Sequence, residues 1–365
     1  MSRRALVLLV ALGCGSGSGA TGRASPPLDA SASSDGPPAP ADVAERGPFH
    51  IGHRVQQIVY RPVGATKDRT IPYDIWYPTN DTTGAEVVYF DIFRDAGAFE
   101  GASPAPPLDG AGYPVHVHSH GAHGFGATSW NVMYHFASHG WVVVAPTHTD
   151  NTLSDVGEPP PVHRSHRAQD ISRTLDATAK LHEAGLLPAP ARTDRVLLSG
   201  HSFGTFTAWA SAGATLDPAV VRRQCAAGTP PCNEAEIASF TGLHDPRVVA
   251  AVPMAGGASD WIASYQSVTV PMFLMTGTAD DVGAPALWDH TAGVNLTWIE
   301  ITGGCHQLFA FGGCASVPDQ EGFAIVSTYA LAFARRHLEG DASARVAGIL
   351  DGTVAVSARV KLQRR

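Results

Sequence analysis

The sequence predicts an α/β fold with a mostly parallel central sheet and helices on both of its faces. Short apolar runs, typical of strands buried on both faces, recur at 141–145, 196–198, 248–252, 272–275 and 296–301. Helical patterns lie before, between and after these runs, at 129–139, 171–181 and 323–338. Ligands of such sheets bind at the carboxyl ends of the strands, so we expect functional residues in the loops that follow the apolar runs.

The individual elements carry their own signals. The segments 71–78 and 115–119 show the alternation of half-buried strands. The helix predicted over 129–139 ends at Gly140, and glycine readily adopts the left-handed conformation that closes a helix. The segment 171–181 places four residues at helical spacing on one face, and one of them is polar: Ile171, Leu175, Thr178 and Leu181.

Composition indicates a globular enzyme with one large core. The chain has 365 residues, of which 44% are hydrophobic and 16% are charged, and α/β folds of this size commonly form a single domain. We place that domain at 48–340 and expect a monomer without a cofactor. The formal net charge is −8, and no run of Lys or Arg could follow a phosphate backbone. These features argue against nucleic acid as a partner.

The first 14 residues have the features of an export signal. Arg3 and Arg4 precede the apolar run 5–12, which Gly13 and Cys14 follow. The residues before Cys14 resemble a bacterial lipoprotein processing site, at which the cysteine becomes lipidated. The alternative is a cleaved secretory peptide that removes Cys14. Both predict an exported protein, either secreted or held at a membrane only through a lipid on Cys14.

Three further segments lie outside the alternating pattern. The segment 15–47 is rich in Gly, Ser, Ala and Pro and lacks the large apolar residues of a core, so it is predicted to be a disordered linker. Region 216–245 is interpreted as an insertion after a central helix, which either covers the active site or forms a pinned surface loop. The tail 341–365 gives no signal.

The cysteines favour export. Without Cys14, four remain in two close pairs, Cys225 with Cys232 and Cys305 with Cys314. Both pairs can close short disulfide loops outside the reducing cytoplasm. Neither has the spacing of a zinc site, and we therefore predict two disulfides.

The segment 200–204, Gly-His-Ser-Phe-Gly, is a G-x-S-x-G motif. It directly follows the predicted strand 195–199 and precedes the helical segment 205–210, which is the strand, tight turn and helix that this motif requires. A serine at such a turn is held in a strained conformation that exposes its hydroxyl. Ser202 is therefore the candidate nucleophile.

A serine nucleophile requires a base and a carboxylate that orients the base, in the chain order serine, acid, histidine. His306 follows the predicted strand 296–301 and is the candidate base, because a bridge from Cys305 to Cys314 would fix its loop. The acid remains open among three aspartates: Asp281 is the first choice, and Asp280 and Asp260 are the second and third.

Two backbone amides must stabilise the negative oxygen of the tetrahedral intermediate. Phe203, directly after the nucleophile, is expected to supply one, and Ala122, in the loop after the strand 115–119, the other. Four aromatic residues near predicted strand ends are expected to line an apolar acyl pocket: Phe125, Trp130, Trp261 and Phe309.

With these pieces in place, the chain resembles the serine α/β-hydrolases grouped with platelet-activating-factor acetylhydrolase and the dienelactone-hydrolase-like enzymes. The matching segments are 75–78, 119–121, 137–146, 200–204 and 303–306. The stretch from Asp281 to Pro285 also resembles the acid loop of cutinase-like polyester hydrolases. The resemblance implies an α/β-hydrolase fold and a carboxylic-ester substrate, which is a small molecule, a lipid or a polyester.

The sequence departs from this group at two places. Dienelactone hydrolases use a cysteine nucleophile, whereas this motif holds Ser202, so that activity is not implied. In the acetylhydrolase the acid follows an earlier strand, and the equivalent place here, near Met254, holds no acid.

Two other functions compete with a serine hydrolase. His116, His118 and His120 alternate along a strand and could bind a metal, although the acid that usually accompanies such a run is missing. The second alternative is a non-catalytic binding lipoprotein built on a hydrolase shell. Because every catalytic part has a candidate residue, we favour the serine enzyme, with no metal.

Overall fold

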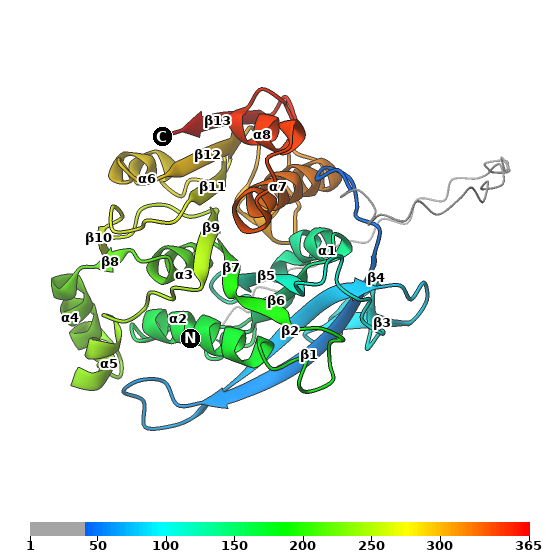
Figure 1. Ribbon diagram of the computed structural model, residues 1–365. Coiled ribbons are helices and arrows are strands. Elements are labelled where there is room, and N and C mark those ends of the chain that lie inside the picture. The colour runs from blue at the N-terminus through cyan, green and yellow to red at the C-terminus, as the bar shows by residue number, and fades with distance from the viewer. Residues whose placement is uncertain (1–40, 156) are drawn as a thin grey trace, which may run out of the picture. The chain divides into compact units, whose positions relative to one another are not determined.

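The computed structural model describes residues 41–155 and 157–365, and a large sheet forms the centre of this part of the chain (Figure 1). The sheet is 11-stranded, in the order β13-β12-β11-β9-β7-β5-β6-β2-β1-β4-β3. Its strands are β1 (His50–Tyr60), β2 (Arg69–Thr79), β3 (Ala85–Tyr89), β4 (Phe93–Glu100), β5 (Tyr113–Ser119), β6 (Val142–Pro146), β7 (Ala191–His201), β9 (Val248–Met254), β11 (Met272–Gly277), β12 (Leu296–Ile301) and β13 (Val360–Arg364). A separate two-stranded sheet pairs β8 (Thr215–Leu216) with β10 (Ile262–Ser264).

The middle of the large sheet is parallel. Every neighbouring pair from β12 to β6 in the strand order is parallel. The antiparallel strands β2 and β13 flank this block, one on each side. The predicted mostly parallel sheet is therefore confirmed, and the carboxyl ends of its central strands meet along one edge.

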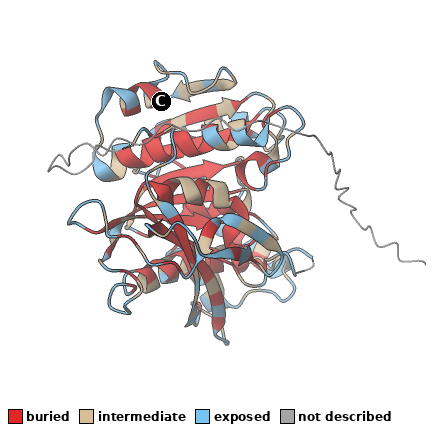
Figure 2. Cartoon of the chain, turned by 90° about the vertical axis from the view of Figure 1, so that its right-hand side faces the viewer, coloured by how far each residue is buried: buried red, intermediate tan, exposed pale blue. Residues whose placement is uncertain are grey.

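Helices cover both faces of the sheet. The helices are α1 (Trp130–Ser138), α2 (His163–Thr178), α3 (Phe203–Ser211), α4 (Pro218–Ala227), α5 (Glu234–Ser239), α6 (Ala284–His290), α7 (Asp319–Ala334) and α8 (Ala344–Asp351), with the short helical turns η1 (Gly126–Ser129), η2 (His306–Phe309) and η3 (Arg335–Glu339). One core cluster contains residues of α2, α3 and α6, and the other contains residues of α1, α7 and α8. Figure 2 shows the buried residues concentrated in the sheet and in the helices packed on it.

Successive residues of the central strands face opposite clusters. Val196 and Leu198 of β7 belong to the cluster with α2 and α3, whereas Leu197 belongs to the cluster with α1 and α7. All three are fully buried. This alternation explains the continuous apolar runs, because a strand covered on both faces has no solvent side.

The three predicted helices are present, but α2 begins at His163, well before the predicted segment 171–181, whereas the ends of α1 and α7 lie closer to the prediction. Gly140, just after α1, has φ +89°, the left-handed conformation expected for it. The four residues predicted on one face over 171–181 are all buried. Thr178, the polar member, satisfies its hydroxyl by donating to the carbonyl of Thr174 at 2.7 Å.

Both ends of the predicted domain need correction. Within the predicted linker, Val43 is buried and its carbonyl lies 2.8 Å from His135 Nε2, so residues 41–47 pack on the domain. The tail 341–365 forms α8 and β13, and β13 extends the sheet beside β12. The predicted export signal, Cys14 and the rest of the linker lie in residues 1–40, outside the described residues. Within the described part, no helix combines the length and apolarity needed to cross a membrane.

The predicted insertion 216–245 forms the helices α4 and α5, which pack beside α2. Ser239 of α5 contacts Ser165 of α2 through their hydroxyls at 2.6 Å. The predicted disulfide between Cys225 and Cys232 is confirmed and links α4 to the turn before α5. The insertion is thus attached to α2 by a side-chain contact and is closed internally by a disulfide.

A buried histidine joins the antiparallel side of the sheet. His53 of β1 lies 2.9 Å from Asp74 of β2 and 2.8 Å from Glu100 of β4, one carboxylate at each ring nitrogen. Burial lowers the pKa of His53, but the hydrogen bonds to both carboxylates outweigh this effect and raise the pKa to about 9. A histidine with two carboxylate partners is protonated at neutral pH, so it forms charged hydrogen bonds to both strands.

We therefore predict that His53 stabilises the fold below pH 7 and loses this effect in alkali. Because the pKa in the folded state is raised above the value of about 6.5 in the unfolded chain, the contribution is complete below pH 6.5 and lost as pH rises through about 9. Denaturant unfolding of His53→Gln should show a deficit that shrinks by about 2 kcal/mol between pH 6 and pH 10, allowing for the partial exposure of Glu100.

His50→Gln, on the same strand but exposed, is the matched control and should show no such pH dependence. An equal deficit of His53→Gln at both pH values would mean that His53 contributes only by packing.

Candidate active site

Ser202 lies in a tight turn between β7 and α3. Its backbone has φ +55° and ψ −115°, in the strained region predicted for the motif. A Cβ at Gly200 would collide with the carbonyl of Gly204, and a Cβ at Gly204 with the carbonyl of Ser119. The amide of Ser202 donates to the carbonyl of Met254 on β9 at 2.9 Å. Both glycines and this bond fix the turn, and Ser202 is left half-buried at its tip.

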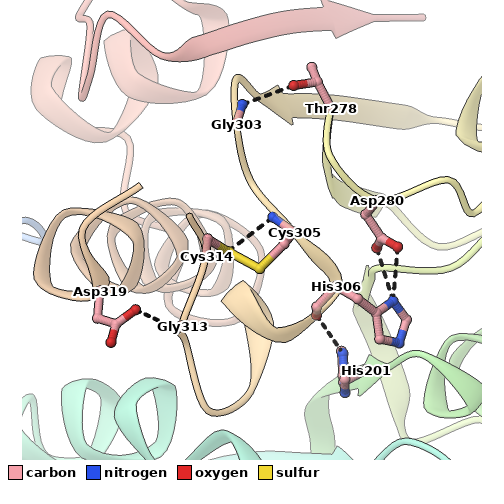
Figure 3. The surroundings of a disulfide bond; sticks show 9 residues. All are labelled: His201, Thr278, Asp280, Gly303, Cys305, His306, Gly313, Cys314 and Asp319. Atoms are coloured by element: carbon pink, nitrogen blue, oxygen red, sulfur yellow. Dashed lines mark hydrogen bonds and ion pairs between the residues drawn. A yellow bond between two sulfur atoms is a disulfide. The ribbon is translucent and has the colours of Figure 1, made fainter. Parts of the chain in front are cut away.

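His306 and an aspartate meet at the ends of β12 and β11. Nδ1 of His306 lies 3.0 Å from Oδ2 and 3.1 Å from Oδ1 of Asp280 (Figure 3). The side chain of Asp280 is 7% exposed and that of His306 is 36% exposed. The carboxylate is thus shielded from water, whereas the imidazole remains partly open.

From the sequence, Asp281 ranks above Asp280 as the candidate acid, whereas the structure places Asp280 beside His306. Asp280 contacts His306, and Asp281 is exposed. The amide of Ala279 donates to the carbonyl of Gly304 at 2.9 Å, and the amide of Gly303 donates to the hydroxyl of Thr278 at 2.9 Å. These bonds fix the register of the two loops, which turns Asp280 inward and its neighbour outward. Asp260, the third choice, is also exposed and makes no contact with His306 among the described hydrogen bonds.

The predicted disulfide between Cys305 and Cys314 is confirmed and closes the loop that carries His306 (Figure 3). In the same loop, the amide of Gly313 donates to Asp319 of α7 at 2.6 Å. The loop of the candidate base is therefore held by a covalent link on one side and by a helix contact on the other, which limits its movement relative to the sheet.

Sequence reasoning missed His201, the variable residue of the motif before Ser202. Its Nε2 lies 3.0 Å from the carbonyl oxygen of His306, and the two rings are 4.9 Å apart. Burial lowers the pKa of His201 to about 3, so the ring is neutral and donates one hydrogen bond. His201 thereby ties the loop of the candidate base to the turn of the candidate nucleophile.

The described residues contain no hydrogen bond between Ser202 Oγ and Nε2 of His306. Such bonds are often long in unliganded enzymes and shorten in the substrate complex. What the structure places together is the strained turn of Ser202, the ring of His306 and the carboxylate of Asp280.

The loop after β5 lies directly against the serine. A Cβ at Gly121 would come within 3.1 Å of both Ser202 Cβ and His201 Nδ1. Ala122 follows and is exposed, and its amide has no acceptor among the described hydrogen bonds. Phe203 is the first residue of α3, a position whose amide has no partner within a helix. Neither predicted amide donor therefore has an acceptor among the described hydrogen bonds, and their role as an anion site stays a prediction.

The four aromatic residues expected in one acyl pocket are divided between two cores. Phe125 and Phe309 are buried in the cluster with α1 and α7, and the half-buried Trp130 packs against that cluster. Trp261 is buried in the cluster with α2 and α3, where it stacks on Phe240. A cavity of about 520 Å³ lies between β8, α4 and α5, and none of the four lines it. The four residues thus pack on both faces of the sheet, because nearness to a strand end does not fix the face on which a side chain packs, and their shared pocket stays a prediction.

The three histidines on β5 and directly after it make hydrogen bonds inside the core. His116 and His118 lie 2.6 Å and 2.8 Å from the hydroxyl of Ser199 on β7. His120 accepts a hydrogen bond from the amide of His148 at 2.9 Å. Burial lowers the pKa of all three, to about 3 for His116. Among the described residues, no group of three or more His, Cys, Asp or Glu side chains could hold a metal.

The sheet order, the turn after β7 and the residues at the strand ends define a protein with the α/β-hydrolase fold. A family model described as Chlorophyllase matches residues 104–227, which is less than half of the chain and includes the turn of Ser202. A ferulic acid esterase from Streptomyces cinnamoneus has a similar structure, with a TM-score of 0.62 and 19% sequence identity. That match covers 89% of this chain and 100% of the esterase chain. A search of curated proteins finds no match, and the resemblance to the acetylhydrolase group stays a prediction.

Proposed function

We propose that this protein is a serine carboxylic-ester hydrolase that works through an acyl-enzyme on Ser202. The pairing of Asp280 with His306 supports this proposal most. The pair lies at the same edge of the sheet as the strained turn of Ser202, which follows the neighbouring part of the parallel block. The names of the matching family and of the similar structure agree with an ester substrate.

In the first half of the reaction, Ser202 Oγ attacks the ester carbonyl carbon while Nε2 of His306 takes its proton. The carbonyl oxygen becomes negative and accepts hydrogen bonds from the amides of Phe203 and Ala122. Asp280 holds Nδ1 of His306 and stabilises the imidazolium. His306 then donates its proton to the alkoxide oxygen, the C–O bond breaks, and the alcohol leaves.

In the second half, His306 takes a proton from water, and the resulting hydroxide attacks the acyl carbon. The tetrahedral intermediate collapses, the acid leaves, and Ser202 recovers its proton from His306. The half-buried Ser202 and the exposed Ala122 make this site open to solvent, so both water and an ester can approach.

We further propose that the domain works after export. Two disulfides close the loops of the insertion and of His306, and such bonds persist in oxidising compartments. The substrate is a small-molecule, lipid or polyester ester. Hydrolysis of p-nitrophenyl esters of increasing chain length, followed by phospholipid and polyester substrates, separates these classes.

A fluorophosphonate probe tests the proposed function directly. We expect a covalent adduct on Ser202, located by peptide mass mapping, and a parallel loss of p-nitrophenyl acetate hydrolysis. EDTA should leave both reactions unchanged. Folded protein that forms no adduct would overturn the serine mechanism, and activity that EDTA removes would favour a metal enzyme instead.

A further inference from the structure

Arg167 of α2 is a fully buried cation that has no carboxylate partner in the described part of the chain. It is 0% exposed, and none of the ion pairs among the described residues includes it. The nearby buried Asp170 is occupied by Arg69 at 3.2 Å and by His148 at 2.8 Å. A buried charge is costly unless it is well hydrogen-bonded. The neutral groups that accept hydrogen bonds from Arg167 therefore indicate which part of the structure this residue holds in place.

The guanidinium of Arg167 hydrogen-bonds neutral acceptors at the end of β5. It donates to the carbonyl of His120 and, at 3.2 Å, to the hydroxyl of Ser119. A third bond, to Asn151 Oδ1 at 2.9 Å, holds the other side of the group. His120 is joined by its peptide bond to Gly121, whose backbone lies against Ser202. Arg167 thus grips the peptide at which the predicted anion-binding loop begins.

The same guanidinium also contacts the start of α3, which carries the other predicted amide donor, Phe203. It lies 4.5 Å from the ring centroid of Phe203, the residue after Ser202. Its Nε donates to Thr207, one turn further along α3, at 3.4 Å. One side chain therefore contacts both segments that carry the predicted amide donors, although these segments are far apart in the sequence.

A second set of buried hydrogen bonds also holds the end of β5, but it does not reach the carbonyl that Arg167 binds. The hydroxyl of Ser119 lies 3.0 Å from Nε2 of His148, whose Nδ1 contacts Asp170. This chain of hydrogen bonds anchors the strand itself. The carbonyl of His120, one residue further, is held by Arg167.

We propose that Arg167 is a positioning residue that fixes the two amide donors of the anion site relative to each other; this inference rests on the proposed function. A trans peptide is planar, so holding the carbonyl of His120 inward also fixes the direction of the Gly121 amide and the start of the loop to Ala122. The positive charge behind the loop also favours the negative oxygen that develops in the transition state.

The test compares Arg167→Lys and Arg167→Gln with the wild type in ester hydrolysis and in binding of a phenylboronate, which forms a tetrahedral adduct with an active serine. Lysine keeps the charge but loses the planar fork that reaches several acceptors at once. We expect kcat to fall about 100-fold in both variants, with KM within about threefold. Boronate affinity should fall by a similar factor, which a general loss of stability would not produce.

Arg247→Gln is the matched control, since Arg247 makes several hydrogen bonds, to Asp245, Asp176 and Ser172, before β9 and away from the site. It should lower Tm and leave kcat unchanged. If the Arg167 variants do not fold, Asn151→Ala, which removes one acceptor of the guanidinium, should still lower kcat about tenfold.

The outcomes separate the two proposals. A wild-type protein without a fluorophosphonate adduct overturns the proposed function, and the role of Arg167 with it. A labelled, active wild type whose Arg167→Lys or Asn151→Ala variant keeps full kcat and boronate affinity overturns the role of Arg167 alone.

Discussion

Ser202→Ala is expected to lower kcat for p-nitrophenyl acetate by about 10⁴-fold or more, with its fold unchanged. In the proposed mechanism the hydroxyl oxygen forms the acyl-enzyme, so removal of the hydroxyl ends covalent catalysis. A residual rate of about 10³ over water can remain, because the amides of Phe203 and Ala122 still stabilise a negative oxygen. Alanine retains the Cβ and therefore the strain at φ +55°, which is why Tm should stay within about 2 °C of the wild type.

Two other variants make this result specific. Ser211→Ala removes a buried hydroxyl from the far end of α3, one without a partner among the described residues, and should leave kcat unchanged. Ser202→Gly should be inactive but more stable by about 1 kcal/mol, because glycine relieves the left-handed strain at a smaller entropic cost. Activity of Ser202→Ala near the wild-type level would show that another residue carries the chemistry.

Much of the fold could be predicted because its core strands are covered on both faces. The apolar runs at β7, β9, β11 and β12 are continuous for that reason, and they identify the parallel block without any knowledge of contacts. The motif around Ser202 has local requirements, two glycines and a strand-turn-helix context, which a sequence displays directly. The same strand order then leads to the loops of Asp280 and His306.

Features that depend on contacts between distant segments could not be predicted. Asp280 and Asp281 are adjacent and chemically identical, and the register set by Ala279 and Gly304 decides between them. β13 has too weak a pattern to be recognised alone, since only one of its faces meets the core. Arg167 resembles any helical arginine in the sequence, and only the packing of α2 under the loop after β5 makes it a buried cation.

The second large effect is expected for Asp280→Asn, which should lower kcat for p-nitrophenyl acetate by about 10³-fold with KM nearly unchanged. The carboxylate contacts Nδ1 of His306, and in the proposed mechanism it balances the charge of the imidazolium in the transition state. Asparagine keeps the shape but carries no charge. Its amide can also donate to Nδ1, which would leave the proton on Nε2 and prevent that atom from acting as the base.

Asp281→Asn is the matched control, because it makes the same chemical change one residue away on an exposed side chain. Solvent and salt screen an exposed charge, so kcat should change by less than about twofold. Asp280, by contrast, is 7% exposed and its interaction with His306 is shielded. A larger loss in Asp281→Asn than in Asp280→Asn would mean that the loop rearranges when substrate binds and that the outward aspartate becomes the partner of the base.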